Sequence, residues 1–463
     1  MEPVTSRVYQ SLSQLKSPLF RGSLLTSASV LERHGTDESY HAARIPDAVA
    51  VASCEGDVQA VLRTCSDHGF PVIPYGAGTS LEGHIHALRG GLSLDVADMN
   101  SVLSVDPDEM TATVQCGILR SQLDNYLRDT GLFFPVDPGA DATLGGMIST
   151  SASGTTTVRY GRMRDNVLGL KVVLPGGKKI QTGKERRGCS SAVDLTSMFI
   201  GAEGTLGVVT EATLKLYPRP EFSRSTVCTF QSMEDAIRTS VKILQQGVGV
   251  SRLEFVDETS IQAVNRAYQS WHEEKPSLFL EFQGSETSTK DEAETVKAIA
   301  NKNDVIDVKT ATELEDQKKL WHARHNSYYA ILALRKGGKG VISDACVPIS
   351  RLAECIRETK EDIADTNIFS AMIGHVGDGN FHVIFVVDLN NLDEIRTAKE
   401  ITSRLSHRAI RMGGTCTGEH GVGMGKIPYL KAECDATSLE LMRTLKKTLD
   451  PKGIMNPGKI IPE

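Results

Sequence analysis

The sequence of 463 residues predicts an α+β protein with two domains. Strand and helix patterns alternate in the first part of the chain until Pro218 and Pro220 interrupt them. Beyond these prolines, strand-like runs alternate with charged helical stretches. The length suits two or three domains, and a content of 40% hydrophobic and 24% charged residues provides enough apolar surface for real cores. A disordered or fibrous protein is therefore excluded.

Overall charge and cysteine usage narrow the classes of function further. The net charge of −7 argues against a general nucleic-acid binder, which needs a basic surface. The nine cysteines include no CxxC pair, which excludes thiolate zinc fingers and ferredoxin-like clusters and suggests a reducing compartment. No run approaches 18 apolar residues, so no transmembrane helix is expected. Residues 3–31 lack acidic residues and contain seven serines; they resemble the end of an organelle transit peptide or form the first helix of the fold.

The first domain is expected to contain short strands, two helices and long glycine-rich connections. Strands are expected at residues 48–52, 71–74, 92–96, 112–114, 170–174 and 207–216, and helices at 57–68 and 120–130. The segment 135–161 is rich in Gly, Ser and Thr and is expected to be a loop.

The second domain is expected to combine a sheet with charged helices. Strands are expected at residues 225–230, 278–282 and 384–387, and helices at 286–302 and 352–365. Residues 413–426 form a further glycine-rich loop. The end of the chain, 450–459, is too rich in Gly and Pro for a helix and is expected to be held in place by contacts.

Three loops of the first domain have a composition suited to binding an extended ligand. In residues 75–83, three glycines follow a strand, so successive N–H groups can form an anion-binding nest beside Thr79 and Ser80. This loop is neither a P-loop nor a GxGxxG motif, and by itself it is equally typical of a tight turn. Residues 135–154 and 201–210 repeat the small-residue pattern. Together the three loops indicate a large dinucleotide.

Two motifs suggest a divalent metal site. If Asp378-Gly379 is a two-residue type I′ turn, His375 lies directly opposite His382, where two imidazoles can share one metal. Glu419, beside His420 in the later glycine-rich loop, offers a third ligand, and such a set suits zinc, manganese or iron. Two strand histidines without a metal, and a salt bridge at Glu419, remain the alternatives.

The motifs together resemble a known family. Residues 74–80, 138–146, 159–167 and 201–210 resemble the FAD domain of the vanillyl-alcohol oxidase type, in particular the FAD-dependent D-lactate dehydrogenases of the cytochrome type. Glycolate oxidase subunits and D-2-hydroxyglutarate dehydrogenase are similar. The resemblance implies a two-subdomain FAD-binding domain (1–220), an α+β cap domain with an antiparallel sheet that binds substrate (221–412), and a C-terminal segment that returns to the FAD site (413–463).

The resemblance also implies roles for individual residues. It assigns FAD binding to Pro74, Gly76, Ala77, Gly78, Thr79, Ser80, Leu81, Pro138, Gly139, Thr143, Gly145, Gly146, Ser149, Ser153, Gly154, Glu203, Gly204, Gly207, Val209 and Asn456. It makes Glu419 the ligand of a zinc or manganese ion and His420 the catalytic base. Arg324 and Lys339 would bind the substrate carboxylate, and Tyr328 would favour a short substrate.

The expected function is oxidation of a short D-2-hydroxy acid, and the expected reaction is D-lactate to pyruvate. A metal would assist deprotonation of the hydroxyl, and a hydride would pass to FAD. D-2-hydroxyglutarate and glycolate are the alternative substrates. A metal-dependent hydrolase or oxygenase without flavin, and a flavin protein with non-redox chemistry, are alternatives from other classes. Electrons would leave to cytochrome c, an electron-transfer flavoprotein, a quinone or oxygen. The expected location is the mitochondrion, or the cytoplasm of a bacterium, and a homodimer is left open.

Overall fold

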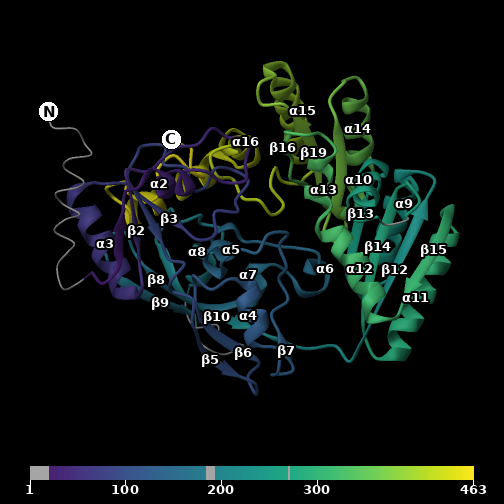
Figure 1. Ribbon diagram of the computed structural model, residues 1–463, viewed down its shortest axis with the longest axis horizontal. Helices are drawn as coiled ribbons and strands as arrows, with labels where there is room; N and C mark the ends of the chain where they lie inside the picture. Colours follow the sequence, from purple (N-terminus) through teal and green to yellow (C-terminus); the bar gives the residue numbers. More distant parts are fainter. Residues whose placement is uncertain (1–19, 184–192, 270–271, 463) are drawn as a thin grey trace. The chain divides into compact units, whose positions relative to one another are not determined.

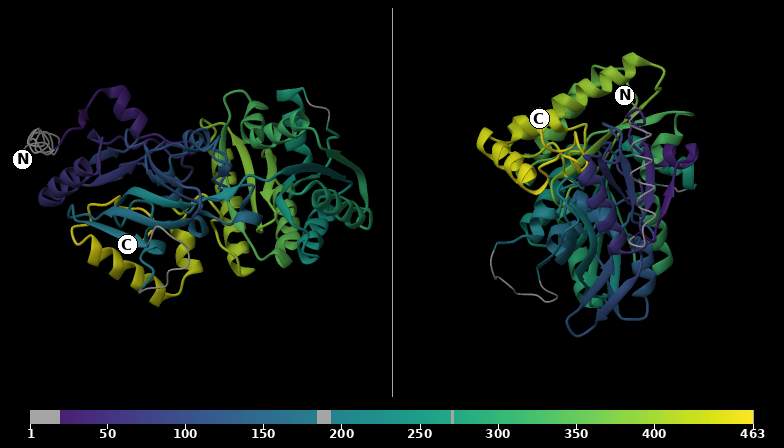
Figure 2. Two further views of the ribbon diagram at one scale, coloured as in Figure 1. Left: turned by 90° about the horizontal axis from the view of Figure 1, so that it is seen from below. Right: turned by 90° about the vertical axis from the view of Figure 1, so that its left-hand side faces the viewer.

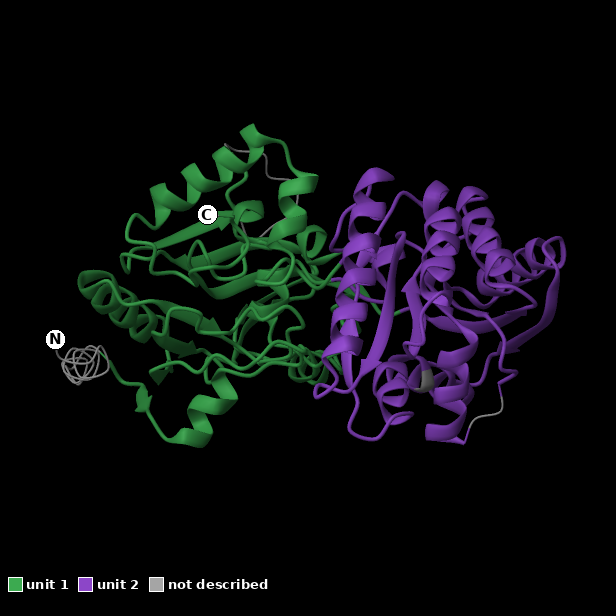
Figure 3. Ribbon diagram, turned by 90° about the horizontal axis from the view of Figure 1, so that it is seen from above, with its two compact units in different colours: residues 1–152, 162–219, 419–463 green, residues 153–161, 220–418 purple. Residues whose placement is uncertain are grey.

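The computed structural model describes residues 20–183, 193–269 and 272–462, which form two compact units (Figures 1 and 3). Unit 1 comprises residues 1–152, 162–219 and 419–463, and unit 2 comprises 153–161 and 220–418. Residues 153–161, which the sequence assigned to the first domain, therefore belong to unit 2. Most of the serine-rich stretch 3–31 lies outside the described residues.

Unit 1 contains a small sheet with a parallel core. Its strands are β1 (Ser23–Leu25), β2 (Ala48–Val51), β4 (Leu92–Asp95) and β3 (Val72–Tyr75), in this spatial order. Strands β2 and β3 both run parallel to β4, and α3 (Glu55–His68) makes the crossover from β2 to β3. The helix buries one apolar stripe, including Val58, Val61 and Leu62, against the sheet. Strand β3 leads directly into the first glycine-rich loop.

A second sheet of unit 1 is antiparallel throughout. Its order is β5 (Val102–Asp106), β6 (Thr111–Gln115), β10 (Val208–Lys215), β8 (Val167–Val173) and β9 (Lys179–Gly183); β7 (Leu132–Phe133) pairs separately with β11 (Tyr217–Pro218). The helices of this unit are α2 (Ala28–His34), α4 (Arg120–Tyr126), α5 (Leu144–Thr150), α7 (Met163–Asn166), α8 (Thr196–Phe199), α16 (Ile427–Glu433) and α17 (Ala436–Leu449). In Figure 2 the returning C-terminal segment, in yellow, runs beside strands of unit 1.

Unit 2 is built on one antiparallel sheet. Its order is β15 (Val305–Ala311), β12 (Phe222–Phe230), β14 (Ser277–Gly284), β13 (Val250–Val256), β18 (Ser370–His375), β19 (Asn380–Val387) and β16 (Lys339–Ile342), with β17 (Ala345–Cys346) also paired to β19. The helices α10 (Glu258–Tyr268), α12 (Leu314–His325) and α13 (Ser327–Ala333) bury apolar side chains against one face. The remaining helices are α6 (Thr157–Tyr160), α9 (Met233–Gln245), α11 (Glu286–Asn301), α14 (Leu352–Ala364) and α15 (Leu392–Arg411).

All strands and helices expected from the sequence occur, with ends displaced by a few residues. The segment 135–161 was wrongly expected to be a continuous loop, because it contains α5 and α6. Helix α5 begins after Thr143, whose hydroxyl accepts the Gly146 N–H, so a capping residue starts a helix despite two glycines in its first turn. The C-terminal prediction is confirmed, since Met455 is buried and bridges to Val72.

Candidate functional site

The glycine-rich loops of unit 1 and the C-terminal segment meet at close range. A Cβ atom added to Gly76 would lie 2.3 Å from Thr143 Oγ1, and one added to Gly204 would lie 2.8 Å from the ring of Pro74. The Asn456 side chain donates to the carbonyl of residue 203 at 2.9 Å. Glycine at these positions lets the loops approach one another, so the structure brings together segments that are distant in sequence.

The first loop has the donors that an anion needs. Among the described residues, no acceptor bonds the backbone N–H groups of Gly76, Ala77, Gly78 or Thr79. Gly78 has a φ of +71°, and the loop is only partly buried. Successive N–H groups in such a turn form a nest for phosphate oxygens. The loop therefore fits the pyrophosphate of a dinucleotide such as FAD.

Several residues predicted to bind FAD also have a packing role in unit 1. A side chain at Gly145 would collide with Cys116, and one at Gly207 would collide with the carbonyl of Val173. Val209 lies in the hydrophobic core of unit 1. These contacts explain why small or apolar residues occur at these positions, and their assignment to FAD stays a prediction.

The other predicted cofactor residues divide between the two units. Gly139 is exposed with open space at its Cβ position, and a Cβ added to Gly146 would lie 3.2 Å from Thr143 Oγ1. The Ser149 hydroxyl donates to a carbonyl of its own helix, and the Ser80 hydroxyl donates to Asp37. Leu81 and Pro138 lie partly buried on the loops of unit 1. Ser153 and Gly154 belong to unit 2.

The histidine hairpin is present, but its predicted register is wrong. His375 pairs with Asn380, and His382 pairs with Ile373, so the two histidines are not directly opposite. The turn has four residues rather than two, because the Asp378 N–H donates to the His375 carbonyl and Gly379 takes a left-handed φ of +85°. A side chain at Gly379 would also collide with the carbonyl of Val347.

The error in register does not separate the two imidazoles. The partner of His375 is shifted by two residues, and a shift of two keeps every side chain on its own face of the sheet. His375 and His382 are therefore diagonal neighbours, with ring centroids 5.6 Å apart and planes at 82°. Two ring nitrogens from these histidines can still face one cation.

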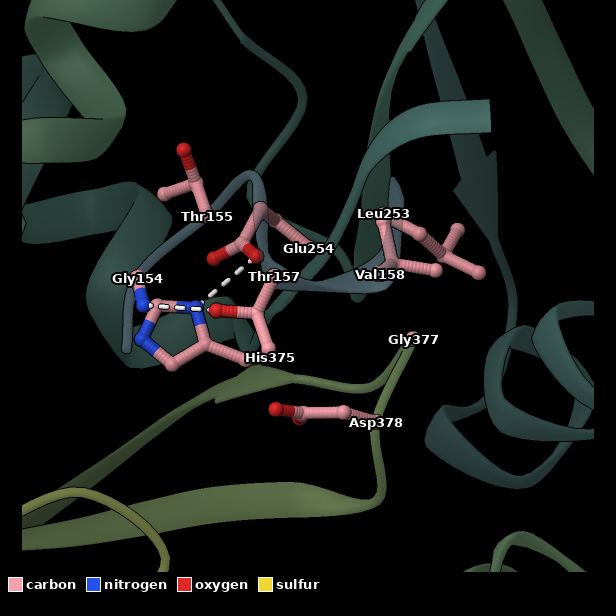
Figure 4. Close-up of a pocket in the computed structure, with 9 residues that line it drawn as sticks. All are labelled: Gly154, Thr155, Thr157, Val158, Leu253, Glu254, His375, Gly377 and Asp378. Carbon is pink, nitrogen blue, oxygen red and sulfur yellow. Dashed lines mark hydrogen bonds and ion pairs between the residues drawn. The ribbon is translucent and has the colours of Figure 1, made fainter. Parts of the chain in front are cut away.

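A buried carboxylate orients His375. Glu254 Oε1 lies 2.8 Å from His375 Nδ1, and its other oxygen accepts a hydrogen bond from Arg324. Figure 4 shows Glu254 and His375 beside the chain at Gly154, where both line a small hollow of unit 2. A carboxylate on Nδ1 leaves Nε2 as the nitrogen that can bind a metal. Glu254 was not predicted from the sequence, although an acidic residue within the apolar run 253–256 could have indicated it.

His382 is oriented by its own set of acceptors. Its Nδ1 lies 3.2 Å from the carbonyl of Ser343 and 3.7 Å from the buried carboxylate of Asp344. Asp344 also accepts the Thr417 hydroxyl at 2.8 Å, and its carbonyl accepts the Gly418 N–H. Asp344 thus fixes the end of unit 2 immediately before Glu419 in the chain. Asp344 was not predicted from the sequence either.

Glu419 and His420 are the first residues of the last segment of unit 1. The two side chains are mostly buried, with His420 Nε2 3.4 Å from Glu419 Oε1. Glu82 lies within unit 1 and pairs with Lys426 at 3.1 Å. Burial raises the pKa of the Glu82 carboxyl, while Lys426 and His420 act in the opposite direction. The charge of Lys426 in this loop is therefore compensated by Glu82 within unit 1.

The predicted substrate residues of unit 2 lie on three elements, Arg324 on α12, Tyr328 on α13 and Lys339 on β16. Arg324 is buried and paired with Glu254, but its Nε has no acceptor among the described residues. A Cβ at Gly340 would lie 2.8 Å from the Tyr328 hydroxyl, so Tyr328 covers the face of β16 to which Gly340 points. Lys339 precedes Gly340 on this strand, points to the opposite face and is exposed. The strand does not direct Lys339 and Tyr328 into one pocket.

Two ranges of the chain match known protein families. Residues 46–183 match the FAD binding domain family, and residues 219–460 match the family of FAD linked oxidases, C-terminal domain. The chain belongs to the FAD-linked oxidases. The second match spans half of the chain, and the first includes the loop with the unbonded N–H groups. FAD is therefore the dinucleotide that the loops of this oxidase fit.

Curated relatives of this FAD-linked oxidase extend over almost its whole length. A probable mitochondrial D-lactate dehydrogenase of Danio rerio is 44% identical over 99% of this chain and 93% of the relative. The mitochondrial cytochrome-type D-lactate dehydrogenase of Arabidopsis thaliana is 41% identical, over 97% and 80%. A glycolate oxidase subunit of Bacillus subtilis is 34% identical, over 90% and 89%.

Solved structures confirm the expected fold of the vanillyl-alcohol oxidase type. p-Cresol methylhydroxylase has a TM-score of 0.79 at 16% identity, covering 98% of this chain and 96% of that structure. An alkyldihydroxyacetonephosphate synthase has a TM-score of 0.77 at 21% identity, covering 97% and 86%. No described helix of this oxidase is long and apolar enough to cross a membrane.

Proposed function

We propose that this chain is a dehydrogenase of short D-2-hydroxy acids, with D-lactate as its best substrate and pyruvate as the product. The observation that carries the proposal is the 44% identity to a probable D-lactate dehydrogenase over almost the whole of both chains. Bound FAD would supply the acceptor for the hydride of the substrate Cα. The nest at residues 76–79 would hold its pyrophosphate.

The histidine pair would hold one divalent metal. His375 and His382 would bind it through Nε2, and Glu419 would supply the third ligand predicted from the sequence. Two histidines and a carboxylate suit zinc or manganese. Such an ion would lower the pKa of the substrate hydroxyl.

The remaining chemistry would rest on two side chains. His420 would remove the hydroxyl proton as the general base. Arg324 would hold the substrate carboxylate through its Nε, a buried donor that needs an acceptor. Lys339, assigned to the carboxylate by the family resemblance alone, stays a prediction.

Tyr328 would restrict the size of the substrate. Its ring packs against the apolar cluster of α13 and the sheet, and its hydroxyl lies beside Gly340 of β16, so its bulk would leave little room for a second carboxylate. One additional methylene on a substrate changes its transition-state binding free energy by only about 1–3 kcal/mol. Several short D-hydroxy acids should therefore react. Glycolate is the second candidate, because a glycolate oxidase subunit is among the relatives.

A separate acceptor, either cytochrome c, an electron-transfer flavoprotein or a quinone, would reoxidise the flavin. The names of the relatives favour a mitochondrial location. A homodimer stays an open prediction.

Anaerobic spectra of the purified protein test this function. We expect flavin absorption bands that bleach with D-lactate and D-2-hydroxybutyrate but poorly with L-lactate. The kcat/KM values for D-lactate and D-2-hydroxybutyrate should exceed those for D-2-hydroxyglutarate and glycolate. A clear preference for D-2-hydroxyglutarate would contradict the interpretation of Tyr328. A yellow protein that no hydroxy acid bleaches would contradict the whole proposal in favour of non-redox flavin chemistry.

A further inference from the structure

Glu203 is a buried carboxylate that the proposed chemistry does not use. The family resemblance assigns it to FAD, but the structure binds both of its carboxylate oxygens within the protein. Val422 N–H donates to Oε1 at 2.7 Å, and Gly423 N–H donates to Oε2 at 2.8 Å. The side chain is 2% exposed, and Oε2 also lies 3.1 Å from His84 Nε2. Its carboxylate is therefore not available to a cofactor.

The two N–H donors belong to the loop that carries His420. They follow it by two and three residues, and Gly421 lies between. A Cβ at Gly421 would sit 2.6 Å from Glu203 Oε1 and 2.8 Å from His84 Nε2, so the loop lies directly on the charged pair. Only glycine allows this approach.

The Glu203 backbone belongs to the glycine-rich loop at 201–207. Its φ of +48° is uncommon for a residue with a side chain. Its N–H donates to the Ser149 carbonyl, and its carbonyl accepts from Asn456. Asn456 also donates to the His84 carbonyl at 3.0 Å, so one amide joins both members of the charged pair. The two backbone hydrogen bonds hold residue 203 in this uncommon conformation, with its carboxylate at the 422–423 backbone.

Resting on the proposed function, we infer that Glu203 is a positioning residue that clamps the backbone after His420 and so fixes the catalytic base relative to the cofactor loops. His84 Nε2 lies beside this buried carboxylate. Hydrogen bonds to a charged group are strong and directional, and a small displacement of a catalytic group costs much of the rate. Substrate and FAD affinity rest on other groups and need not change.

Glu203→Gln tests the clamp, with Glu211→Gln as the control. The glutamine amide would turn a donor toward one of the two N–H groups, while the backbone bonds of residue 203 remain. Glu211 is also in unit 1, on the strand that follows this loop, and pairs with Lys171 at 2.7 Å outside the site.

We expect two changes in Glu203→Gln that are absent in the control. Hydrogen exchange of the Val422 and Gly423 amides should become at least about 10-fold faster, since they lose a charged acceptor. The rate of flavin reduction by D-lactate should fall about 10-fold or more, while KM and flavin content change less than about twofold. Gly421→Ala, which pushes the loop from the same pair, should reproduce both changes and serves as the second variant if Glu203→Gln does not fold.

Three results would overturn the inference: unchanged exchange at these two amides, faster exchange with an unchanged rate of flavin reduction, or loss of flavin from Glu203→Gln. The last would return Glu203 to cofactor binding. If no hydroxy acid reduces the wild-type flavin, the proposed function fails by itself. The exchange rates still decide whether Glu203 clamps the loop, because they need no substrate.

Discussion

Single residues of unit 2 show how far side-chain identity alone could define the site. His375 and His382 were recognisable from their spacing in the sequence, but their true relation is diagonal. Glu254 and Asp344, which orient these histidines, escaped notice because each is one acidic residue in an apolar stretch. Sequence spacing reports neighbours within a hairpin, whereas partners from β13 and the β16–β17 connection depend on the packing of the whole sheet.

Glu254→Gln tests the importance of this orientation. The amide can bond to only one of its partners correctly, so His375 Nδ1 or Arg324 loses its acceptor. We expect the affinity for zinc or manganese to fall about 10–100-fold, as is typical when the carboxylate behind a metal-binding histidine is lost. Metal titration followed by elemental analysis measures this change.

Glu281→Gln provides the control for that experiment. Glu281 lies on the adjacent strand and binds Arg252 at 3.1 Å, so it is a comparable, mostly buried carboxylate. Its replacement should leave metal affinity within about twofold. Equal metal content in Glu254→Gln and the wild type would show that Glu254 does not orient a metal ligand.

At the scale of elements, the glycine-rich loop after β3 was predicted well, and the short helices within residues 135–161 were not. The loop after β3 follows from its glycines and from the strand before it. Helix α5 depends on a threonine cap and on packing of Leu144 and Ile148 into the core, which composition does not reveal. The register of the β18–β19 hairpin likewise depends on Gly379 fitting against Val347, a contact between distant segments.

The loop after β3 gives a prediction with a close control. Gly78 and Gly69 both have left-handed φ values, +71° and +70°, so alanine strains the backbone equally at either position. At Gly78 the new Cβ would also meet the Tyr75 hydroxyl at 2.6 Å, whereas at Gly69 nothing lies within 4 Å. We expect Gly78→Ala to be purified mostly without flavin and Gly69→Ala to keep it, as measured by absorbance. Equal flavin content in both variants would contradict the assignment of this loop to the pyrophosphate.

The C-terminal segment gives a prediction for pH. Burial lowers the pKa of Lys459 from 10.5 to about 8, although Glu203 and Asp37 oppose this shift. Between about pH 8 and 10.5 the unfolded state therefore binds more protons than the folded state, so the free energy of unfolding rises with pH in this window. It is lowest below pH 8, where the buried ammonium is charged. The Tm of the wild type relative to Lys459→Met should rise between pH 7.5 and 9.5. A constant difference would show that Lys459 titrates normally.

At the scale of the whole molecule, the chain passes through each unit more than once, and this was only partly visible in the sequence. Pro218 and Pro220 indicated the long passage through unit 2 that begins at residue 220, and the glycine-rich end indicated the return. The excursion of residues 153–161 into unit 2 was not expected. Arg159 anchors it by donating to the Gln283 carbonyl at 2.8 Å, and Tyr160 bonds the side chain of the same residue. Such contacts between distant segments leave no local pattern in the sequence.

The division into units predicts that the two cores respond differently to added cofactor. Trp321 is buried in the core of unit 2, so the difference in fluorescence between the wild type and a Trp321→Phe variant follows that unit during heating. Trp271, the other tryptophan, lies outside the described residues. The nest proposed for FAD lies in unit 1, whose unfolding releases the flavin and raises flavin fluorescence. A ligand stabilises the unit that binds it, by about 2.7 kcal/mol at a concentration 100 times its Kd. Excess FAD should therefore raise the temperature of flavin release by several degrees more than that of the tryptophan transition. If both transitions shift by the same amount at every FAD concentration, the units unfold as one cooperative body, and stabilisation of either one is shared by the other.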